Sequence, residues 1–579
     1  MASNSGPLVR APRRAAPDWL LQLLTCLLLL GWTTGCASLP SHVERPPSHA
    51  FTTPEQTALG RLALERRTAA GTRAGSGFLL LDSVETAFTS RLALVEGAER
   101  SLDLQYYAIH ADTSTAVLLE RIRAAARRGV RVRILLDDFN SVGEDAQVLR
   151  LAFEPGVEIR LFNPLVGSRR SLLTRVLGSL PDVQRIQKRM HNKLFIADNA
   201  WGITGGRNLG DAYFGGDGES AFVDLDVMAA GAIVKPMSAS FDRFWNDQLA
   251  YPVQALLSRK DLDRLREAGR ASGAPGSGAA SAQEAPEAAP AAAAKSAAAV
   301  ADGRPSTVLP DGAPAAKAWA QRPAMDLRRA PLVWAPSTLL VDEPGKIGPG
   351  DDEAGAGDTV VDGLLQLMQQ ARSELLIISP YFVPGPQMME VFRQARARGV
   401  AVRVLTNSLA SNDAPAAHAG YRRYRRGLLR MGVELHEMRA DSQSAALHGG
   451  RSHSGAGLGS AAGGSKSGAT RASLHSKAVV IDRRLSVIGS MNLDLRSHKQ
   501  NSEVALLIRS RKLADLAAGL IERSFAEGTY RVELDGEGGL AWRAPPGAAF
   551  GDATQEPEAS LRLRGLVNLL APFAPDEML

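Results

Sequence analysis

Cysteine is almost missing from this sequence. Its 579 residues include two cysteines, Cys26 and Cys36, and both lie near the N-terminus. A disulfide framework or a thiolate metal site needs several cysteines in the folded body. We therefore expect neither, and the sequence offers no other obvious cluster of metal ligands. The expectation is a protein that needs no metal ion and no cofactor.

A large charge of one sign is missing as well. The formal net charge is +6, and it falls to +4 without residues 1–35, whose charged side chains are Arg10, Arg13, Arg14 and Asp18. Proteins that bind nucleic acids usually carry a stronger basic excess. We therefore expect no nucleic-acid partner and only a mild attraction to anionic surfaces.

The apolar run near the N-terminus, residues 19–30, is too short for a comfortable bilayer span. Arginines precede it, and Thr33-Thr34-Gly35-Cys36 follows it. This order resembles a bacterial lipoprotein signal, which implies removal of residues 1–35 and a lipid on Cys36. Because Ala37 and Ser38 follow the cysteine, the resemblance favours the periplasmic face of the outer membrane. An uncleaved N-terminal anchor is the alternative.

The length exceeds that of one ordinary core, so we expect two domains and linkers. Two segments rich in small and polar residues cannot build a core, namely 263–325, rich in Ala, Gly and Pro, and 441–470, rich in Gly and Ser. We predict the following division: a signal at 1–35, a tether with a helix at 36–76, a first lobe at 77–262, a linker at 263–325, a second lobe at 326–545 that contains the insertion 441–470, and a tail at 546–579.

The two halves of the chain look alike. In each, a helical stretch leads into an apolar strand, and a second helix then ends at a glycine followed by another strand. These glycines are Gly129 and Gly399, and each stands where a left-handed helix cap is expected. The sequence therefore predicts an internal repeat of helix–strand–helix–strand units.

Each half also carries the pattern His-x-Lys-x-x-x-x-Asp, and an Asn follows 17 residues after the His. We take the residues of the two patterns as candidate catalytic and phosphate-binding groups: His191, Lys193, Asp198 and Asn208 in the first half, and His475, Lys477, Asp482 and Asn492 in the second. On a strand, residues i and i+2 face the same side, so each His and its Lys share a surface. The Asp then lies at the far end of the strand.

Two copies of this set suit displacement at a phosphodiester. One His can attack phosphorus while the other protonates the leaving group and later deprotonates the acceptor. Lysines and asparagines can stabilise the nonbridging oxygens. Asp226 and Glu503, which follow the two motifs at similar places, are candidates to orient the histidines.

The paired motifs resemble those of the phospholipase D superfamily, over residues 77–507. Residues 406–413 and 418–425, with Tyr106-Tyr107 and residues 379–382, are similar to its bacterial cardiolipin synthase branch of the C type. The resemblance implies an α/β fold with two α/β/α lobes related by a pseudo-twofold axis, mixed central sheets flanked by helices, and one active site between the lobes. It also implies transfer of a phosphatidyl group from phosphatidylglycerol or phosphatidylethanolamine to phosphatidylglycerol, with His191 as nucleophile and His475 as acid and base.

Two other functions use the same scaffold: a hydrolase that releases phosphatidic acid, or a phosphodiesterase that cuts another substrate such as nucleic acid. A lipid-binding protein without activity would need loss of a motif, and both motifs are intact. Further candidates carry less weight. The arginines at 422, 423, 425 and 426 could bind headgroups or form a solvated helix face, His418 could contact substrate or be structural, and residues 561–570 could lie on a membrane or pack on the body. The sequence does not indicate an accessory protein partner.

Overall fold

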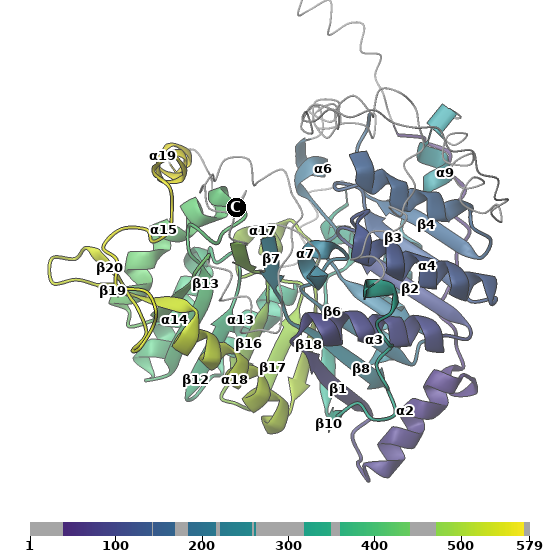
Figure 1. Cartoon of the computed structure of the whole chain (residues 1–579), viewed down its shortest axis with the longest axis horizontal. Coiled ribbons are helices and arrows are strands. Elements are labelled where there is room, and N and C mark those ends of the chain that lie inside the picture. The colour runs from purple at the N-terminus through teal and green to yellow at the C-terminus, as the bar shows by residue number, and fades with distance from the viewer. Residues whose placement is uncertain are drawn as a thin grey trace, which may run out of the picture.

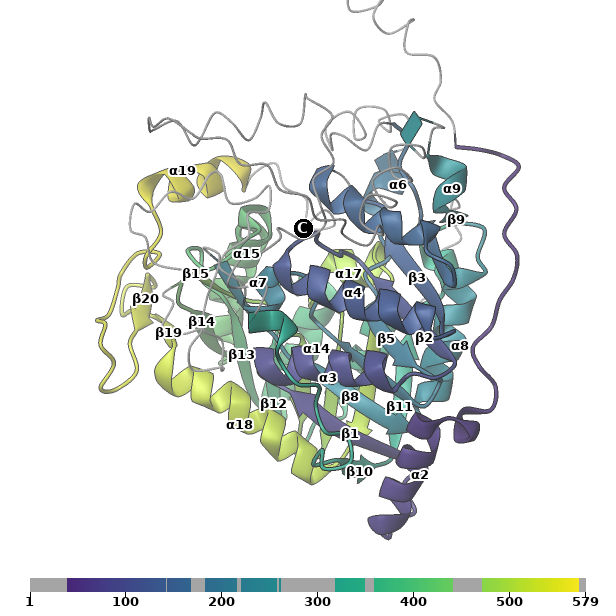
Figure 2. The same ribbon diagram turned by 45° about the vertical axis from the view of Figure 1, so that its right-hand side comes forward.

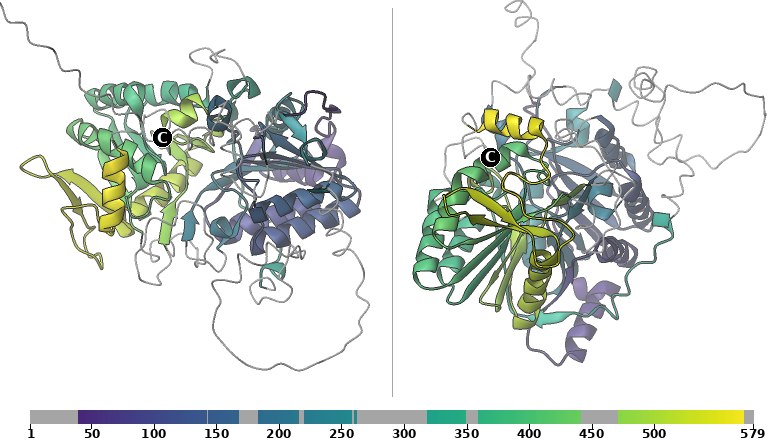
Figure 3. Two further views of the ribbon diagram at one scale, coloured as in Figure 1. Left: turned by 90° about the horizontal axis from the view of Figure 1, so that it is seen from above. Right: turned by 60° about the vertical axis from the view of Figure 1, so that its left-hand side comes forward.

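The computed structural model describes residues 39–141, 143–167, 183–215, 220–257, 260–261, 318–348, 359–440 and 471–571. The predicted signal 1–35, the lipidation residue Cys36 and the insertion 441–470 lie outside these residues, as does most of the linker 263–325. The described residues form two lobes that lie side by side (Figures 1 and 3). No helix of the described chain is long and apolar enough to cross a membrane.

Each lobe is built on a mixed sheet of nine strands. In spatial order, the first sheet contains β10 (Val333–Ala335), β1 (Ser76–Leu81), β8 (Asp226–Gly231), β6 (Trp201–Gly205), β5 (Leu194–Ala197), β2 (Ser101–Tyr106), β3 (Arg131–Asp137), β4 (Val157–Phe162) and β9 (Ala250–Pro252). The second contains β11 (Ser337–Val341), β18 (Val504–Arg509), β17 (Leu485–Gly489), β16 (Ala478–Ile481), β12 (Glu374–Ile378), β13 (Ala401–Asn407), β14 (Glu434–Met438), β19 (Thr529–Leu534) and β20 (Leu540–Arg543). The sheets have the same strand order from β1 and β11 onward, which confirms the predicted repeat.

The helices flank both sheets (Figures 1 and 2). Those of the first lobe are α2 (Ala58–Ala69), α3 (Val84–Gly97), α4 (Thr113–Arg127), α6 (Val183–Gln187), α7 (Asp211–Phe214), α8 (Val234–Trp245) and α9 (Val253–Leu256). Those of the second are α13 (Val360–Gln369), α14 (Gly385–Ala397), α15 (Pro415–Arg430), α17 (Leu495–Lys499), α18 (Arg511–Glu527) and α19 (Leu561–Leu570). Short 3-10 segments lie at Pro54–Gln56, Gly143–Phe153 and Pro344–Lys346. The predicted caps are present, because φ is 95° at Gly129 after α4 and 82° at Gly399 after α14.

The lobe boundary lies later in the chain than the sequence predicts. Strand β10, inside the segment 326–545 assigned to the second lobe, pairs with β1 of the first sheet. The next strand, β11, pairs with β18 of the second sheet. The chain therefore crosses between the lobes at Pro336, after it has added an edge strand to the first sheet.

The core has three large parts. One lies between the first sheet and α2, α3 and α4, and another between the second sheet and α13, α14 and α15. The third is shared by both lobes, and it includes Ile196 and Val227 from the first sheet with Val480 and Ile488 from the second. Helices α8 and α18 also contribute buried side chains to it. Burying such side chains stabilises by about 1.5–3 kcal/mol each, so the two lobes form one cooperative body.

The motif aspartates stand at the far ends of the motif strands and hold the neighbouring strand in place. Asp198, which is fully buried, accepts hydrogen bonds from the backbone N–H groups of residues 99, 100 and 101 at 2.8–2.9 Å. Asp482 accepts the equivalent bonds from residues 372, 373 and 374 at 2.7–3.1 Å. Both aspartates have positive φ, of 53° and 52°, which Asp tolerates better than most residues. Their contacts therefore support a structural role, and membership of the catalytic set stays a prediction for both aspartates.

These contacts predict that Asp198→Ala destabilises the protein more than the matched substitution Asp482→Ala. Asp198→Ala leaves backbone donors without their acceptor and should lower the free energy of unfolding by about 3 kcal/mol. Asp482→Ala should cost less, about 1–2 kcal/mol, because Asp482 is partly exposed and water can replace it. Urea unfolding measures both values. Asp515→Ala on the exposed face of α18 is the control, with a change of about 0.5 kcal/mol or less. An Asp198 variant as stable as this control would contradict the structural role.

Candidate active site

The backbone at and just before each motif histidine is hydrogen-bonded to the opposite lobe. The N–H of His191 donates to the carbonyl of Ser502 at 3.0 Å, and the N–H of Ser502 donates to the carbonyl of Arg189 at 3.0 Å. The N–H of His475 donates to the carbonyl of Val223 at 2.8 Å. Just before it, β15 (Arg471–Leu474) pairs in parallel with β7 (Ser220–Val223), which Figure 1 shows at the boundary between the lobes. Each lobe therefore fixes the backbone of the other lobe's histidine.

Each histidine also binds a carboxylate from the opposite lobe. Nδ1 of His191 lies 3.0 Å from both carboxylate oxygens of Glu503. Nδ1 of His475 lies 2.7 Å from Oδ2 of Asp224. Both carboxylates are buried, so each is well placed to fix the ring orientation and to leave Nε2 as the reactive nitrogen. The structure thus brings His191 and Glu503 together as the sequence predicts, but the partner of His475 is Asp224.

The assignment of Asp226 as an orienting carboxylate is wrong. Asp226 accepts from Arg91 at 2.9 Å and from the backbone N–H of Arg207 at 3.1 Å, inside the first lobe. The reason is register. Gly205 pairs with Asp226, and the equivalent Gly489 pairs with Ala505. The carboxylate that binds a histidine lies two residues before the partner of this glycine. It is Asp224 in the first lobe and Glu503 in the second.

The glycines after the motifs make room for these carboxylates. A Cβ on Gly205 would meet the backbone of Asp226 at 2.5 Å, and one on Gly206 would meet the Asp224 carboxylate at 2.1 Å. At the position equivalent to Gly206, the second lobe has Ser490, whose hydroxyl donates to Glu503. Glycine at 205 and 206 therefore permits the close approach of these two segments.

Two residues that the sequence analysis missed hold the chain just before each histidine. Asp137, at the end of β3, accepts from the N–H of Met190 at 2.9 Å. Asn407, at the end of β13, accepts from the N–H of Leu474 at 2.9 Å and donates to its carbonyl at 2.9 Å. Both residues are polar side chains at equivalent places in the repeat, at the last position of β3 and β13, and this is the signal that could have revealed them.

The two motif lysines are buried beside the histidines. Nζ of Lys193 donates to the carbonyl of His191 at 2.8 Å, and Nζ of Lys477 donates to the carbonyl of His475 at 2.6 Å. Burial lowers the pKa of Lys193 to about 7, and the charge of Glu503 only partly opposes this. Burial likewise lowers the pKa of Lys477. An anionic substrate would favour the charged form of both lysines, since it adds the negative charge that the buried site lacks.

The charges of the four motif side chains act on one another across the two lobes. Burial lowers the pKa of His191 to about 4, although Glu503 opposes the shift. Burial also lowers the pKa of His475 well below its usual value, and the charges of Lys477, Lys193 and His191 add to this. Charge from one lobe thus acts on the histidine of the other. Both imidazoles are neutral at pH 7 before substrate binds.

Aromatic rings form the walls around the histidines. Tyr107 packs edge-on against His191 at 5.2 Å between ring centroids. Tyr213 and Phe222 pack against His475 at 5.3 and 5.0 Å. These rings lower the local polarity, which strengthens electrostatic interactions with any bound phosphate.

The two motif asparagines differ in their surroundings. Asn208 donates to the hydroxyl of Tyr213 at 2.9 Å and accepts from the N–H of Ala108 at 3.3 Å. Asn492 is equally buried, yet its Oδ1 has no hydrogen-bond partner among the described residues. A buried polar atom without a partner is costly unless a ligand satisfies it. Phosphate binding by both asparagines stays a prediction.

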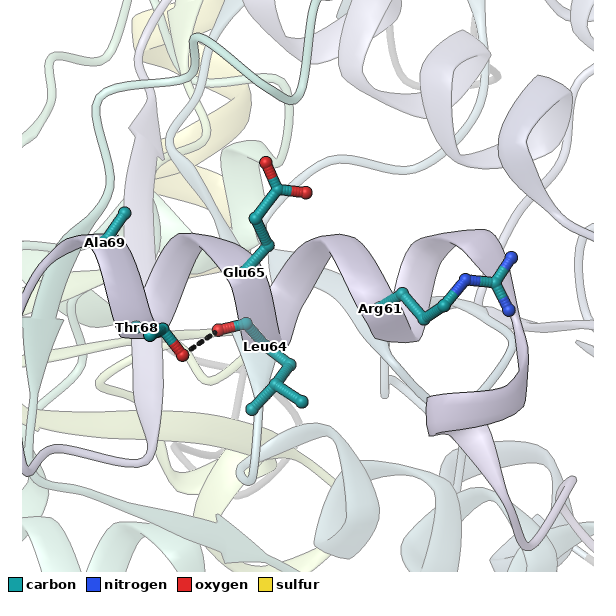
Figure 4. A pocket seen from close by; sticks show the side chains of 5 residues that line it. All are labelled: Arg61, Leu64, Glu65, Thr68 and Ala69. Atoms are coloured by element: carbon teal, nitrogen blue, oxygen red, sulfur yellow. Dashed lines mark hydrogen bonds between the residues drawn. The ribbon is translucent and has the colours of Figure 1, made fainter.

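Other candidates lie outside this site. His418 is fully buried and binds Arg425 at 3.0 Å, and Arg425 binds Glu556 at 2.9 Å. These two side chains are therefore structural. A separate hollow on α2 is lined by Arg61, Leu64, Glu65, Thr68 and Ala69 (Figure 4). The Thr68 hydroxyl there donates to the Leu64 carbonyl at 2.9 Å, as in an ordinary helix, and neither motif contributes a residue to this lining.

The chain is similar to several known proteins. A family model described as "Cardiolipin synthase, PLD-like domain" matches residues 92–245 and 364–525. Cardiolipin synthase C of Escherichia coli (strain K12) is 36% identical over 468 residues, which cover 80% of this chain and 88% of the relative. Cardiolipin synthase A of Pseudomonas entomophila (strain L48) is 24% identical over 453 residues, covering 77% and 68%. Among solved structures, phosphatidylserine synthase of Haemophilus influenzae Rd KW20 aligns with a TM-score of 0.47 and 13% identity, over 80% of this chain and 91% of that chain.

The fold and the paired motifs define a two-lobed phospholipase D-like enzyme. The chain belongs to the cardiolipin synthase family of phospholipase D-type phosphatidyltransferases.

Removing the charge of Asp224 should lower activity, whereas removing the charge of Asp226 should lower stability. Asp224→Asn leaves His475 without an anionic partner and should lower kcat on the order of 100-fold or more while the fold persists. Asp226→Asn weakens a buried pair with Arg91 and should lower the free energy of unfolding by about 3 kcal/mol. Steady-state kinetics and urea unfolding of both variants test this. Equal loss of kcat per folded molecule in the two variants would contradict the assignment of Asp224.

Proposed function

We propose that this protein makes cardiolipin by transferring a phosphatidyl group from one phospholipid, phosphatidylglycerol or phosphatidylethanolamine, to a hydroxyl of phosphatidylglycerol. The observation that carries the proposal is the pair of buried histidines, each bound through Nδ1 to a carboxylate of the opposite lobe. Two such imidazoles can act on one phosphorus, one as nucleophile and the other as acid and base.

In the first step, Nε2 of His191 attacks phosphorus and the bond to the leaving headgroup oxygen breaks. His475 gives that oxygen a proton, so the headgroup leaves with a free hydroxyl and the phosphatidyl group stays on His191. In the second step, His475 takes a proton from the acceptor hydroxyl. The acceptor oxygen then attacks phosphorus, the bond to His191 breaks, and the product is released.

The surroundings of Glu503 support His191 as the nucleophile. Burial alone would raise the pKa of Glu503, but the hydrogen bond with the His191 ring and the nearby charge of Lys193 hold that pKa below the usual value. Ser490 and Ser497 also donate to this carboxylate. Glu503 therefore stays ionised and can balance the positive ring of a phosphohistidine. Burial raises the pKa of Asp224, so the partner of His475 is less firmly ionised.

His475 must be protonated to act as the acid, and the bound lipid favours this protonation. A phosphate anion next to His475 raises the pKa of the imidazole, because opposite charge favours the protonated form. Lys193 and Lys477 stabilise the charge on the nonbridging oxygens in the transition state. We propose that Asn208 and Asn492 assist them.

The test is product formation by the purified full-length enzyme. With phosphatidylglycerol, alone or mixed with phosphatidylethanolamine, we expect cardiolipin by mass spectrometry and none from His191→Ala or His475→Ala. Phosphatidic acid as the sole product would instead identify a hydrolase, and no lipid product would refute both. Rapid quenching and peptide mapping should find the phosphatidyl label on His191. A label on His475 would reverse the two roles.

We also propose that the protein is lipidated at Cys36 and works on the periplasmic face of the outer membrane. Its substrates are lipids, and α19 offers a surface suited to them. Leu563 and Val567 pack this helix against the loop residues Leu409 and Ala410, near the site, whereas Leu561 and Leu569 are 83% and 66% exposed. Figure 2 shows α19 above α15. Exposed leucines on an amphipathic helix bind the membrane interface.

This proposal predicts two separable effects. In cells, Cys36→Ser should move the protein out of the outer-membrane fraction. With the protein lacking residues 1–36, the double change Leu561→Asp and Leu569→Asp should weaken binding to phosphatidylglycerol vesicles on the order of 10-fold. The change Leu64→Asp on α2, also at an exposed leucine, is the control and should have no effect. Equal binding by all variants would contradict membrane docking through α19.

A further inference from the structure

A buried ion pair lies next to the carboxylate that binds His191. Nζ of Lys346 lies 2.7 Å from Oδ2 of Asp342, and the two side chains are 4% and 1% exposed. Asp342 is the residue after β11, and Lys346 ends the 3-10 segment Pro344–Lys346. Burying two charges costs free energy unless they are paired and hydrogen-bonded, so the further contacts of the pair indicate what it supports.

Asp342 holds the backbone of Glu503. The N–H of Asp342 donates to the carbonyl of Glu503 at 3.0 Å, and the N–H of Glu503 donates to Oδ2 of Asp342 at 2.9 Å. The other carboxylate oxygen accepts the N–H of Val360, the first residue of α13, at 2.7 Å. Strands β11 and β18 are paired as far as Val341 and Val504. Asp342 therefore extends this pairing by one residue, to Glu503.

Lys346 holds the side chain of Glu503 through a serine. Nζ of Lys346 donates to the carbonyl of Ser497 at 2.9 Å, and the hydroxyl of Ser497 donates to Oε1 of Glu503 at 2.9 Å. The same hydroxyl accepts the N–H of Asn492 at 3.2 Å. The contacts close a ring, because Lys346 is linked to the backbone of Glu503 through Asp342 and to its carboxylate through Ser497.

The first lobe holds its orienting carboxylate in another way. The strand register makes Ser83 equivalent to Asp342. The Ser83 hydroxyl accepts the N–H of Thr86 at 3.1 Å and caps α3. The carbonyl of Asp224 accepts from the guanidinium of Arg207 at 2.5 Å. The two lobes thus fix equivalent carboxylates with different side chains, and the buried lysine lies on the side of Glu503.

The charge of Lys346 matters because Asp342 and Glu503 are neighbouring buried carboxylates. Burial raises the pKa of Asp342, the charge of Lys346 and its hydrogen bond oppose the shift, and the charge of Glu503 adds to it. One ammonium group thus helps both carboxylates to stay ionised side by side. The other titratable groups that interact with Glu503 are His191 and Lys193 of the first lobe and Lys477 and Asp494 of the second.

We propose that Asp342 and Lys346 are positioning residues of the reaction, which hold the Glu503 carboxylate on Nδ1 of His191 and keep it charged. This inference rests on the proposed function, in which Glu503 balances the positive ring of the phosphohistidine. Both residues act through Glu503, and neither is expected to contact the lipid. Loss of the lysine should therefore affect the chemical step more than lipid binding.

The experiment measures release of the headgroup from labelled phosphatidylglycerol by the full-length enzyme, because this step comes before an alcohol or water is used as acceptor. Lys346→Met should lower kcat per folded molecule on the order of 10-fold and change KM by less than about twofold. The acid limb of the pH profile of kcat/KM should move to higher pH by about one unit. The reason is that loss of a nearby cation lets Glu503 and His191 bind protons more readily.

Two other changes at this position separate charge from hydrogen bonding. Lys346→Gln keeps N–H donors for Asp342 and Ser497 but removes the charge, so the acid limb should move as in Lys346→Met. The glutamine variant also tests the charge if the methionine variant does not fold. Lys346→Arg keeps the charge, so its acid limb should stay near the wild-type position.

Arg133→Met is the matched control. Arg133 is also a fully buried cation, and it pairs with Asp103 and Asp242 at 2.7 Å in the first lobe. Its loss should lower stability and leave kcat per folded molecule and the acid limb unchanged. The inference is overturned if Lys346→Met and Lys346→Gln match this control in kcat and acid limb while the wild-type enzyme releases the headgroup. Absence of headgroup release by the wild-type enzyme would refute the proposed function itself.

Discussion

The exchange of carboxylates between the lobes is the constraint on which the rest of the site depends. His191 is held by Glu503 of the second lobe, and His475 by Asp224 of the first. Neither lobe could complete its own histidine alone, so the active site exists only when the two sheets pack on each other. The shared apolar core provides that packing. The same contact that stabilises the fold therefore also assembles the chemistry.

Burial of this assembly explains its electrostatic character. Four basic side chains and two carboxylates lie together in a place with little water, and desolvation lowers the pKa of the histidines and lysines alike. These four basic side chains therefore favour their neutral forms more than the same groups do in water. An anionic phosphate removes this penalty, because it supplies the missing counter-charge. Substrate binding and protonation of these histidines and lysines are therefore coupled. The protonation state that reacts is favoured only in the complex with substrate.

The sequence predicted much of this arrangement and failed where three-dimensional register decides. The repeat, the capping glycines and the pairing of His with Lys follow from local periodicity, which a sequence displays directly. Asp226 was predicted because it follows the first motif at a place similar to that of Glu503 after the second, but the hydrogen-bond register places Asp226 opposite Gly205. Asp198 and Asp482 belong to the motif, yet their hydrogen bonds serve neighbouring strands. A sequence motif shows which residues occur together. It does not distinguish catalytic residues from residues that stabilise the fold.

The two lobes repeat one fold, but the proposed reaction gives their equivalent histidines different roles. The motifs are nearly identical, so the differences must come from residues outside them. Glu503 is fixed by Ser490 and Ser497, whereas the position equivalent to Ser490 is Gly206, which leaves Asp224 without that hydroxyl. An ancestral symmetric pair of lobes could bind phosphate equally well from either face. Differences of this kind give the two faces distinct tasks, since one must stabilise a covalent bond to phosphorus and the other must bind an alcohol.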